Sequence, residues 1–396
     1  MGRDRVVVNG HSAGWLKKGF PWVYPKELVR GGGRRGQEIT LVSNQGQVLG
    51  RGLADDGWLA ARVYRFDDAP LDEAWLHETL DRAAALREIV IPEDTDAYRL
   101  VHGENDGLPG VRLDWWGHFA VLILDTPAAA PLIEGVLSWL ESRRSPRGVY
   151  LCYRPDSRDR RRSEDWSPAP GLLAGRAAPG DVRVRERGVR FDVRPHEGPD
   201  VGLYCDMREV RAWLEPCWGG MSVLNTFAYT GAFSVAAAFH GATEVVSVDL
   251  SARYLDRAEQ NFAANSLDPA PHEFVVDDTF KALDRFRRQG RLFDRVVLDP
   301  PSFSHSSEGT WSAQRDYPRL VAAAARVTAP GGWVVAASNQ GELSPHQFTG
   351  LVGKGLSKAK RSAQLLHFAG AASDFPAAVR FPEGRYLKVG VYRLDG

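Results

Sequence analysis

The sequence has few cysteines and no long apolar run. Its 396 residues include three cysteines, Cys152, Cys205 and Cys217, which have neither the spacing of a metal site nor the even number of a disulfide framework. No apolar stretch approaches the roughly 18 residues of a membrane helix, and the start of the chain lacks the apolar core of a signal peptide. We therefore expect a cytoplasmic protein with reduced thiols, no metal site and no membrane partner.

The chain also lacks net charge, although its charge is unevenly distributed. Residues 1–65 contain eleven Lys or Arg against five Asp or Glu, a net charge of +6, so the remainder carries −6. Basic charge on one module is typical of a protein that binds phosphates, and here it favours RNA. A solvated basic face over an aromatic mini-core is the alternative. The candidate RNA-binding residues are Lys17, Lys18, Trp22, Lys26, Arg34 and Arg35.

Length and punctuation divide the chain into three expected domains. A chain of 396 residues is too long for one ordinary core. Short alternating runs broken by glycines indicate a small β-rich domain at residues 1–68. A central α+β domain is expected at residues 72–193, with helices near 72–88 and 130–143, strands near 111–113, 119–124 and 148–154, and a closing hairpin. Residues 194–396 form the third domain.

The most informative stretch runs from Val223 to Asp249. It consists of an apolar strand, a loop with one glycine, a small-residue helix and a second apolar strand that ends in Asp249. This order is typical of a nucleotide-binding βαβ unit, in which the distal carboxylate binds the ribose hydroxyls. Gly231 is the only glycine of the loop, and two of its other positions are aromatic. A pyrophosphate needs close backbone approach from several glycines, so the loop suits S-adenosylmethionine better. A structural sheet whose strand happens to end in a carboxylate is the alternative.

Further carboxylates follow the next two expected strands. Asp277 and Asp278 come after one apolar run, and Asp299 comes after another. Ligands bind outside the carboxyl ends of such strands. The alternation predicts a doubly wound α/β sheet with right-handed crossovers and a final antiparallel hairpin. Strands are expected near 222–227, 245–249, 273–276, 293–298 and 332–337, and helices near 231–240, 251–265, 279–289, 312–329 and 344–358.

Several segments resemble a known family. The loop NTFAYTG, the segment VDLSARYLDRAEQNFAANSLD and the motif DPPSFS are similar to the class I, S-adenosylmethionine-dependent 23S ribosomal RNA methyltransferases. KKGFPWVYPKELV is similar to the start of that family's N-terminal PUA domain, and FPEGRYLKVGVYR resembles its closing hairpin. The resemblance implies a Rossmann-like methyltransferase domain, a PUA-like domain, S-adenosylmethionine as cofactor and large-subunit rRNA as partner. It leaves a homodimer open.

The strand ends and the resemblance together indicate which residues bind the cofactor. Asp249 is expected to bind the ribose, and Asp277 or Asp278 the adenine amine. Arg208 is expected to pair with the methionine carboxylate, with a helix-surface salt bridge as the alternative. The full set of expected cofactor-binding residues is Arg208, Asn225, Phe227, Tyr229, Thr230, Gly231, Asp249, Ser251, Asp277, Asp278 and Asp299.

The target atom depends on the segment after the fifth strand. The family's 5-methylcytosine branch has Ser-Cys-Ser there and its 7-methylguanine branch has Ser-Asn-Asn, whereas this chain has Ser338-Asn339-Gln340. Cytosine C5 needs a thiolate that adds to C6, whereas guanine N7 attacks with its own lone pair. We expect guanine N7 methylation without a covalent intermediate, although the PUA layout resembles the cytosine branch. The expected catalytic residues are Asp299, Pro300, Pro301, Phe303 and Asn339.

Three other readings stay open. Methylation of an exocyclic amine is compatible with the Asp-Pro-Pro motif. A small-molecule methyltransferase would use the same cofactor site, but would have little use for about 200 residues of N-terminal domains. A noncatalytic RNA-binding assembly protein would not need the carboxylates at the strand ends.

Overall fold

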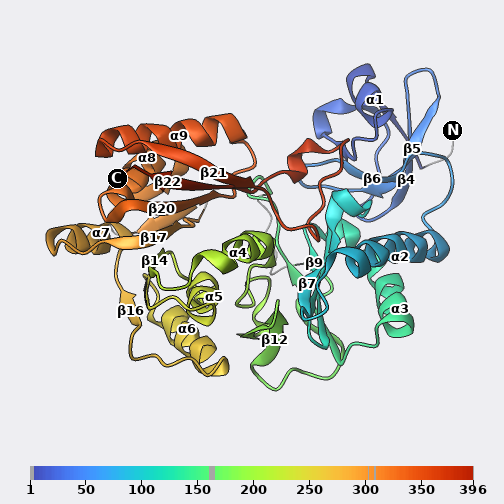
Figure 1. The fold of residues 1–396 in the computed structure, drawn as a ribbon. Helices are drawn as coiled ribbons and strands as arrows, with labels where there is room; N and C mark the ends of the chain where they lie inside the picture. Colours follow the sequence, from blue (N-terminus) through green and yellow to red (C-terminus); the bar gives the residue numbers. More distant parts are fainter. Residues whose placement is uncertain (1–3, 160–165, 302, 307–308, 396) are drawn as a thin grey trace. The chain divides into compact units, whose positions relative to one another are not determined.

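The computed structural model describes residues 4–159, 166–301, 303–306 and 309–395, with the side chains of residues 303–314 outside that description. The chain forms two compact units, whose elements are labelled in Figure 1. Unit 1 comprises residues 1–184, 193–201 and 373–384, and unit 2 comprises residues 185–192, 202–372 and 385–396. The division into three domains stays a prediction. No described helix is long and apolar enough to cross a membrane.

Unit 1 contains two β-sheets with separate elements around them. The first sheet has the strand order β2-β6-β5-β4-β1-β3, which confirms the β-rich start of the chain. Val8, Leu41 and Val63 belong to its apolar core. The helix α1 (Gly10–Leu16), which is capped by Asn9, was not predicted. The strands are β1 (Arg5–Val8), β2 (Trp22–Val23), β3 (Leu28–Arg30), β4 (Glu38–Val42), β5 (Val48–Ala54) and β6 (Ala61–Arg65).

The second sheet of unit 1 has the order β11-β10-β9-β8-β7 and packs against α2 (Glu73–Val90) and α3 (Ile133–Arg143). The expected helices and strands of this region are confirmed, whereas β7 and β11 were not predicted. The strands are β7 (Ala97–His102), β8 (Val111–Trp116), β9 (Phe119–Leu124), β10 (Gly148–Tyr153) and β11 (Gly171–Gly175), and the hairpin β12 (Val182–Glu186) and β13 (Val189–Val193) follows.

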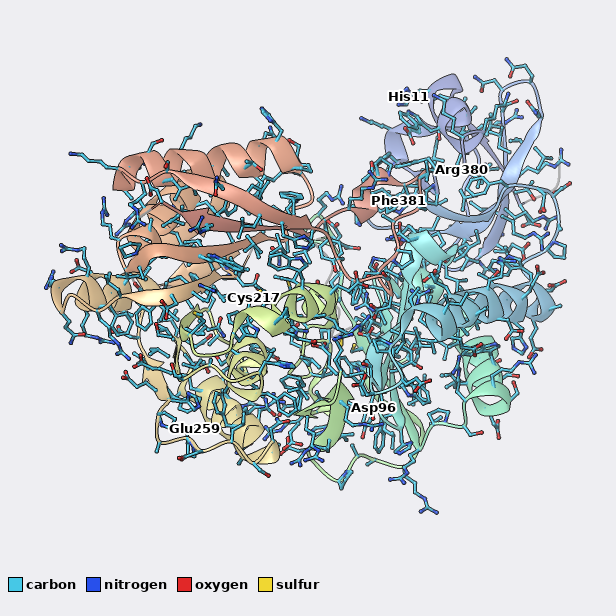
Figure 2. The ribbon with its side chains drawn as sticks, viewed as in Figure 1. His11, Asp96, Cys217, Glu259, Arg380 and Phe381 are labelled. Atoms are coloured by element: carbon cyan, nitrogen blue, oxygen red, sulfur yellow. The ribbon has the colours of Figure 1, made fainter. Side chains whose placement is uncertain are left out.

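A segment from the far end of the sequence completes unit 1. Residues 373–384 return to this unit, and their Asp374 is fully buried. The guanidinium of Arg87 donates to the Asp374 carbonyl at 2.7 Å, and the backbone N–H of Arg99 donates to the Asp374 carboxylate at 2.8 Å. Phe381, labelled in Figure 2, packs edge-on against Trp22, with ring centres 4.7 Å apart. The first unit therefore needs residues from both ends of the sequence.

Unit 2 is a doubly wound sheet with the order β16-β15-β14-β17-β20-β22-β21. Its first five strands pair in parallel, and β22 and β21 are antiparallel additions, as predicted. The helices α7, α8 and α9 pack on one face, and α4 lies on the other. The strands are β14 (Ser222–Thr226), β15 (Glu244–Asp249), β16 (Glu273–Val276), β17 (Phe293–Leu298), β20 (Thr328–Ser338), β21 (Ala363–Ala369) and β22 (Lys388–Leu394), and the helices are α4 (Arg208–Leu214), α5 (Ala232–Phe239), α6 (Ala252–Ala264), α7 (Thr279–Arg288), α8 (Ala313–Ala325) and α9 (Pro345–Ala359).

This topology brings the predicted site together. Parallel strands place their carboxyl ends at one edge of the sheet. Thr226, Asp249, Val276, Leu298 and Ser338 end the five parallel strands at that edge. Because β22 is antiparallel to β20, its first residue lies there too. A hairpin of β18 (Phe303–Ser306) and β19 (Gly309–Ser312) follows the Asp-Pro-Pro motif and was not predicted.

Candidate active site

The loop between β14 and α5 has an unusual backbone. Phe227 and Tyr229 adopt positive φ angles of 56° and 51°. Residues other than glycine avoid this conformation, which persists only where the surroundings impose it and is frequent at ligand sites. The backbone N–H of Tyr229 donates to the Asp249 carboxylate at 2.8 Å, and the Tyr229 ring lies against the rings of Tyr204 and Tyr254, with centres 5.3 and 4.6 Å away. These contacts hold the loop in its strained form.

Asp249 lies at the centre of this arrangement. One carboxylate oxygen accepts from the Tyr229 N–H, and the other accepts from the Ser251 N–H at 2.9 Å. A carboxylate has about four acceptor positions, so two neighbouring hydroxyls can still bind to it. Ser251 itself caps α6. The carboxylate is therefore fixed in orientation before any ligand binds.

Three of the predicted cofactor residues stabilise the loop between β14 and α5 through contacts with the protein interior. Asn225 is buried and donates to the Ser234 hydroxyl at 2.9 Å, and the buried Thr230 hydroxyl donates to the Gly202 carbonyl. Gly231 has a φ of 79°, and a Cβ atom there would lie 2.8 Å from the Cβ of Ala258. The structure thus explains Gly231 by the close approach of α6 to α5.

The two carboxylates after β16, Asp277 and Asp278, have different partners. One oxygen of Asp278 accepts from the backbone N–H groups of Phe280 and Lys281 at 2.9 and 3.1 Å and so caps α7. Its other oxygen has no hydrogen-bond partner among the described residues. Asp277 forms an ion pair with Arg285 at 2.7 Å. Asp278 is therefore the carboxylate of the pair with an oxygen that accepts no hydrogen bond from the described residues.

Asp299 follows β17 and is only partly exposed. It makes no hydrogen bond within the described part of the chain. Burial, and then the negative charge of Asp206, raise the pKa of Asp299 to about 7, while the positive charge of Arg211 acts in the opposite direction. Asp206 in turn accepts from the Tyr386 hydroxyl at 2.7 Å. An aspartate with this pKa changes its charge near neutral pH, which is frequent at functional sites.

The segment after β20 meets a residue that sequence reasoning missed. Lys388 is 2% exposed, and its ammonium donates to the carbonyls of Gln340 and Tyr386. Burial lowers the pKa of Lys388 to about 8. Asn339 is exposed, and Pro300 is buried whereas Pro301 is exposed. The sequence signal for Lys388 is a cation at the start of the largely apolar strand β22.

Two predicted residues have other outcomes. The Arg208 side chain is 1% exposed, so the interpretation as a helix-surface salt bridge is wrong, because the α4 residue faces the interior. Phe303 begins β18, and its side chain lies outside the described residues.

The predicted RNA-binding residues differ in surroundings. Lys17, Lys18, Lys26 and Arg34 are exposed. Arg35 is also exposed and pairs with Asp56, with its Nη2 at 2.7 Å from the carboxylate. By contrast, Trp22 is half-buried and donates to the Glu104 carboxylate at 2.8 Å, which fits the mini-core alternative.

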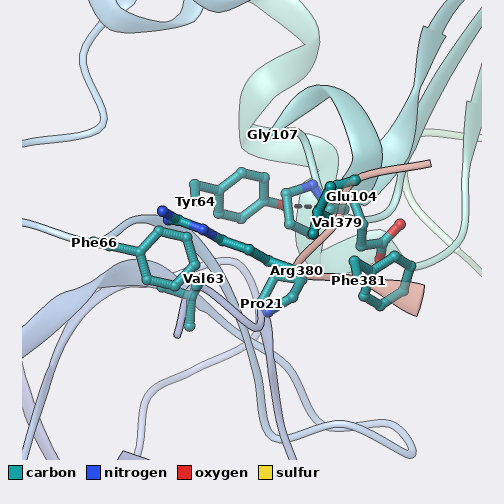
Figure 3. A pocket seen from close by; sticks show the side chains of 12 residues that line it. Pro21, Val63, Tyr64, Phe66, Glu104, Gly107, Val379, Arg380 and Phe381 are labelled. Carbon is teal, nitrogen blue, oxygen red and sulfur yellow. Dashed lines mark hydrogen bonds between the residues drawn. The ribbon is translucent and has the colours of Figure 1, made fainter. Parts of the chain in front are cut away.

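A cavity of about 280 Å³ opens beside this aromatic cluster. Figure 3 shows Arg380 extended between Tyr64 and Phe66, with Phe381 and Glu104 at the other side. Every residue that lines the cavity belongs to unit 1. The segment 373–384 therefore contributes to the surface of the basic module.

Comparisons with known proteins agree with this geometry. A family model for S-adenosylmethionine-dependent methyltransferases matches residues 158–384, and a model for a PUA-like domain matches residues 6–66. The ribosomal RNA large subunit methyltransferase I of Klebsiella pneumoniae (strain 342) is 34% identical over 390 residues, which cover 97% of this chain and 96% of the relative. The enzyme of that name from Enterobacter sp. (strain 638) is also 34% identical over 390 residues, with 97% of both chains covered.

Solved structures give the same result. The crystal structure of a candidate methyltransferase complexed with SAH matches with a TM-score of 0.87 and 26% identity, covering 98% of this chain and 99% of the other. A candidate S-adenosylmethionine-dependent methyltransferase from Streptococcus mutans matches with a TM-score of 0.85 and 26% identity over the same shares. The chain is therefore an S-adenosylmethionine-dependent methyltransferase with a PUA-like domain, and belongs to the family that includes the ribosomal RNA large subunit methyltransferases I.

Proposed function

We propose that the protein methylates a base of ribosomal RNA, and specifically of 23S rRNA, in the cytoplasm. Full-length similarity to ribosomal RNA large subunit methyltransferases I and the basic PUA-like module support this proposal. The cofactor S-adenosylmethionine, when bound, supplies an electrophilic methyl group on a sulfonium. The protein must orient the base and place charge near the reacting atoms.

The residues at the sheet edge suit this cofactor. We assign the ribose hydroxyls to Asp249, whose two oxygens are already oriented by backbone N–H groups. The Asp278 oxygen that accepts no hydrogen bond from the described residues suits the adenine amine. Arg208 suits the methionine carboxylate, because a guanidinium binds a carboxylate through charge-assisted hydrogen bonds.

We further propose guanine N7 as the target atom, without a covalent enzyme intermediate. The observation that carries this proposal is the segment Ser338-Asn339-Gln340 at the end of β20, which offers amides and a hydroxyl but no thiol. Because no proton has to leave N7, the protein must orient the base and place negative charge near it. Asp299, held by Pro300 and Pro301, supplies the charge. Asn339 suits the guanine O6, and Phe303 or Tyr229 suits stacking on a splayed base.

Cytosine C5 is the second candidate target. It requires a cysteine thiolate, and burial raises the pKa of the Cys152 thiol to about 12 and also raises the pKa of Cys217. Cys205 favours this candidate, because it adjoins Asp206, whose charge acts on Asp299. Its side chain is 5% exposed.

Two measurements decide between the targets. Nucleoside mass spectrometry of rRNA from cells with and without the gene should show loss of 7-methylguanosine. Replacing Cys152, Cys205 and Cys217 by serine should leave single-turnover methylation nearly unchanged, whereas loss of a covalent nucleophile costs several orders of magnitude. A captured adduct with 5-fluorocytosine RNA, or an inactive Cys205→Ser enzyme that folds and binds cofactor, would move the assignment to cytosine C5. Unchanged rRNA nucleosides would refute the proposal of rRNA methylation.

A further inference from the structure

A groove between α7 and α8 collects positive charge in unit 2. It encloses about 350 Å³, and its lining includes Lys281 and Arg287 of α7, Arg319 of α8, and Arg326 just beyond that helix. All four cations are exposed. The carboxylate in this lining, Asp284, pairs with Arg287 at 2.8 Å. Among the described residues of the lining, four cations against one carboxylate give a formal charge of +3, in a chain whose net charge is zero.

Two of these charges have no compensating carboxylate among the described residues. The guanidinium carbon of Arg319 lies 4.3 Å from the centre of the Phe280 ring, and Arg319 forms no ion pair with any described residue. Arg326 donates to the carbonyl of Lys358 at 3.3 Å, which orients its guanidinium without neutralising it. A contact with an aromatic face restricts the side chain and leaves its charge available. The groove therefore offers positioned cations to a ligand.

The groove starts beside the cofactor edge of the sheet. Helix α7 begins at Thr279, directly after its cap Asp278, and Lys281 donates its backbone N–H to that cap. The ten residues of α7 extend about 15 Å away from the edge. A strand whose base is methylated at this edge can thus continue along the helix.

We infer that the groove between α7 and α8 binds phosphates of the substrate RNA. This inference rests on the proposed function, and it adds an RNA contact in unit 2 to the one expected in the PUA-like module. Arginine suits the task because its planar fork matches the oxygens of a phosphate. A merely solvated basic face would account for exposed cations, but it does not account for their grouping around one hollow.

The test uses the full-length protein and an in vitro transcript of 23S rRNA, with binding measured at several salt concentrations. We expect Lys281→Gln, Arg287→Gln, Arg319→Gln and Arg326→Gln to weaken binding by about fivefold each near physiological salt and to reduce the slope of log affinity against log salt by about 0.7 to 0.9 each. Arg319→Lys keeps the charge and should retain most of the wild-type slope. Cofactor affinity and thermal midpoint should not change.

The matched control is Lys354→Gln, which removes an exposed lysine of α9 outside the groove. It should bind RNA as the wild type does. If the wild type binds and methylates the transcript while all four groove variants show its affinity and slope, the inference is overturned and the proposed function stands. A defect seen only on ribosomal particles, and not on naked RNA, would assign the groove to an acidic protein and also overturn it. A wild type that neither binds nor methylates rRNA would refute the proposed function itself.

Discussion

At the scale of single residues, Asp299 couples the site to pH. Its pKa of about 7 results first from burial and then from Asp206. A raised pKa disfavours the ionised carboxylate in the folded protein, so stability is greatest below the ordinary pKa of aspartate and falls as pH rises through 7. The proposed role needs the ionised form. Stability and activity should therefore change with pH in opposite directions.

This opposition can be measured with Asp299→Asn. The single-turnover rate of the wild type should rise between about pH 6 and pH 8 as the carboxylate ionises, and the rate of the variant should be lower and nearly independent of pH in that range. Between the same limits, the thermal midpoint of the cofactor-free wild type should fall relative to that of the variant. A wild-type rate that falls with pH, or identical profiles of both proteins, would contradict the role given to Asp299.

Other residues of the site show why its details escape sequence reasoning. Asp249 and Asp299 were found because a carboxylate after an apolar strand is a local signal. Lys388 and the burial of Arg208 were not found, because they depend on neighbours from distant elements. Asn225 and Thr230 were grouped with the cofactor by their place in the loop, whereas their side chains bind protein atoms.

At the scale of elements, the parallel strands of unit 2 and their helices were predictable within a few residues. Each strand is a largely apolar run bounded by turn residues, and the helices α6 to α9 have an amphipathic period, whereas α5 is a run of small and apolar residues. The helix α1 and the strands β18 and β19 are too short to show such a period, and they were not predicted. The return of residues 373–384 to unit 1 leaves no local signal, because it depends on the contacts of Arg87 and Arg99 with Asp374.

The close approach of α6 to the start of α5 gives a prediction for Gly231, which ends the loop between β14 and α5. Gly231→Ala puts a side chain into a left-handed conformation, at a cost of about 1 to 2 kcal/mol, and forces its Cβ against Ala258. Chemical denaturation should show a loss of at least that size, and calorimetry should show weaker cofactor binding because the loop moves.

The control is Gly353→Ala in α9, where a Cβ atom meets nothing within 4 Å. There the change should stabilise the helix by about 0.5 to 1 kcal/mol and leave cofactor affinity unchanged. Equal stability of Gly231→Ala and the wild type would contradict the packing argument.

At the scale of the whole molecule, positive charge is concentrated in particular regions although the net charge of the chain is zero. The module at residues 1–65 carries +6, and a second concentration of cations lies in the groove between α7 and α8. Deleting the module is not a clean test, because Leu53 and Tyr64 share a core with residues 75–166. Substitution of exposed cations keeps the fold and removes only charge. Lys17, Lys18, Lys26 and Arg34 are exposed and suit this purpose.

We expect Lys17→Gln, Lys18→Gln, Lys26→Gln and Arg34→Gln together to weaken rRNA binding and to lower its salt slope by about 0.7 to 0.9 for each phosphate that the protein no longer neutralises. Because these cations and those of the groove belong to different units, their effects on RNA affinity should add when both sets are combined. Cofactor affinity, which depends on the sheet edge of unit 2, should remain as in the wild type. A combined variant no weaker than the groove variant alone would show that the module does not touch the RNA, and its basic surface would then be a solvated face.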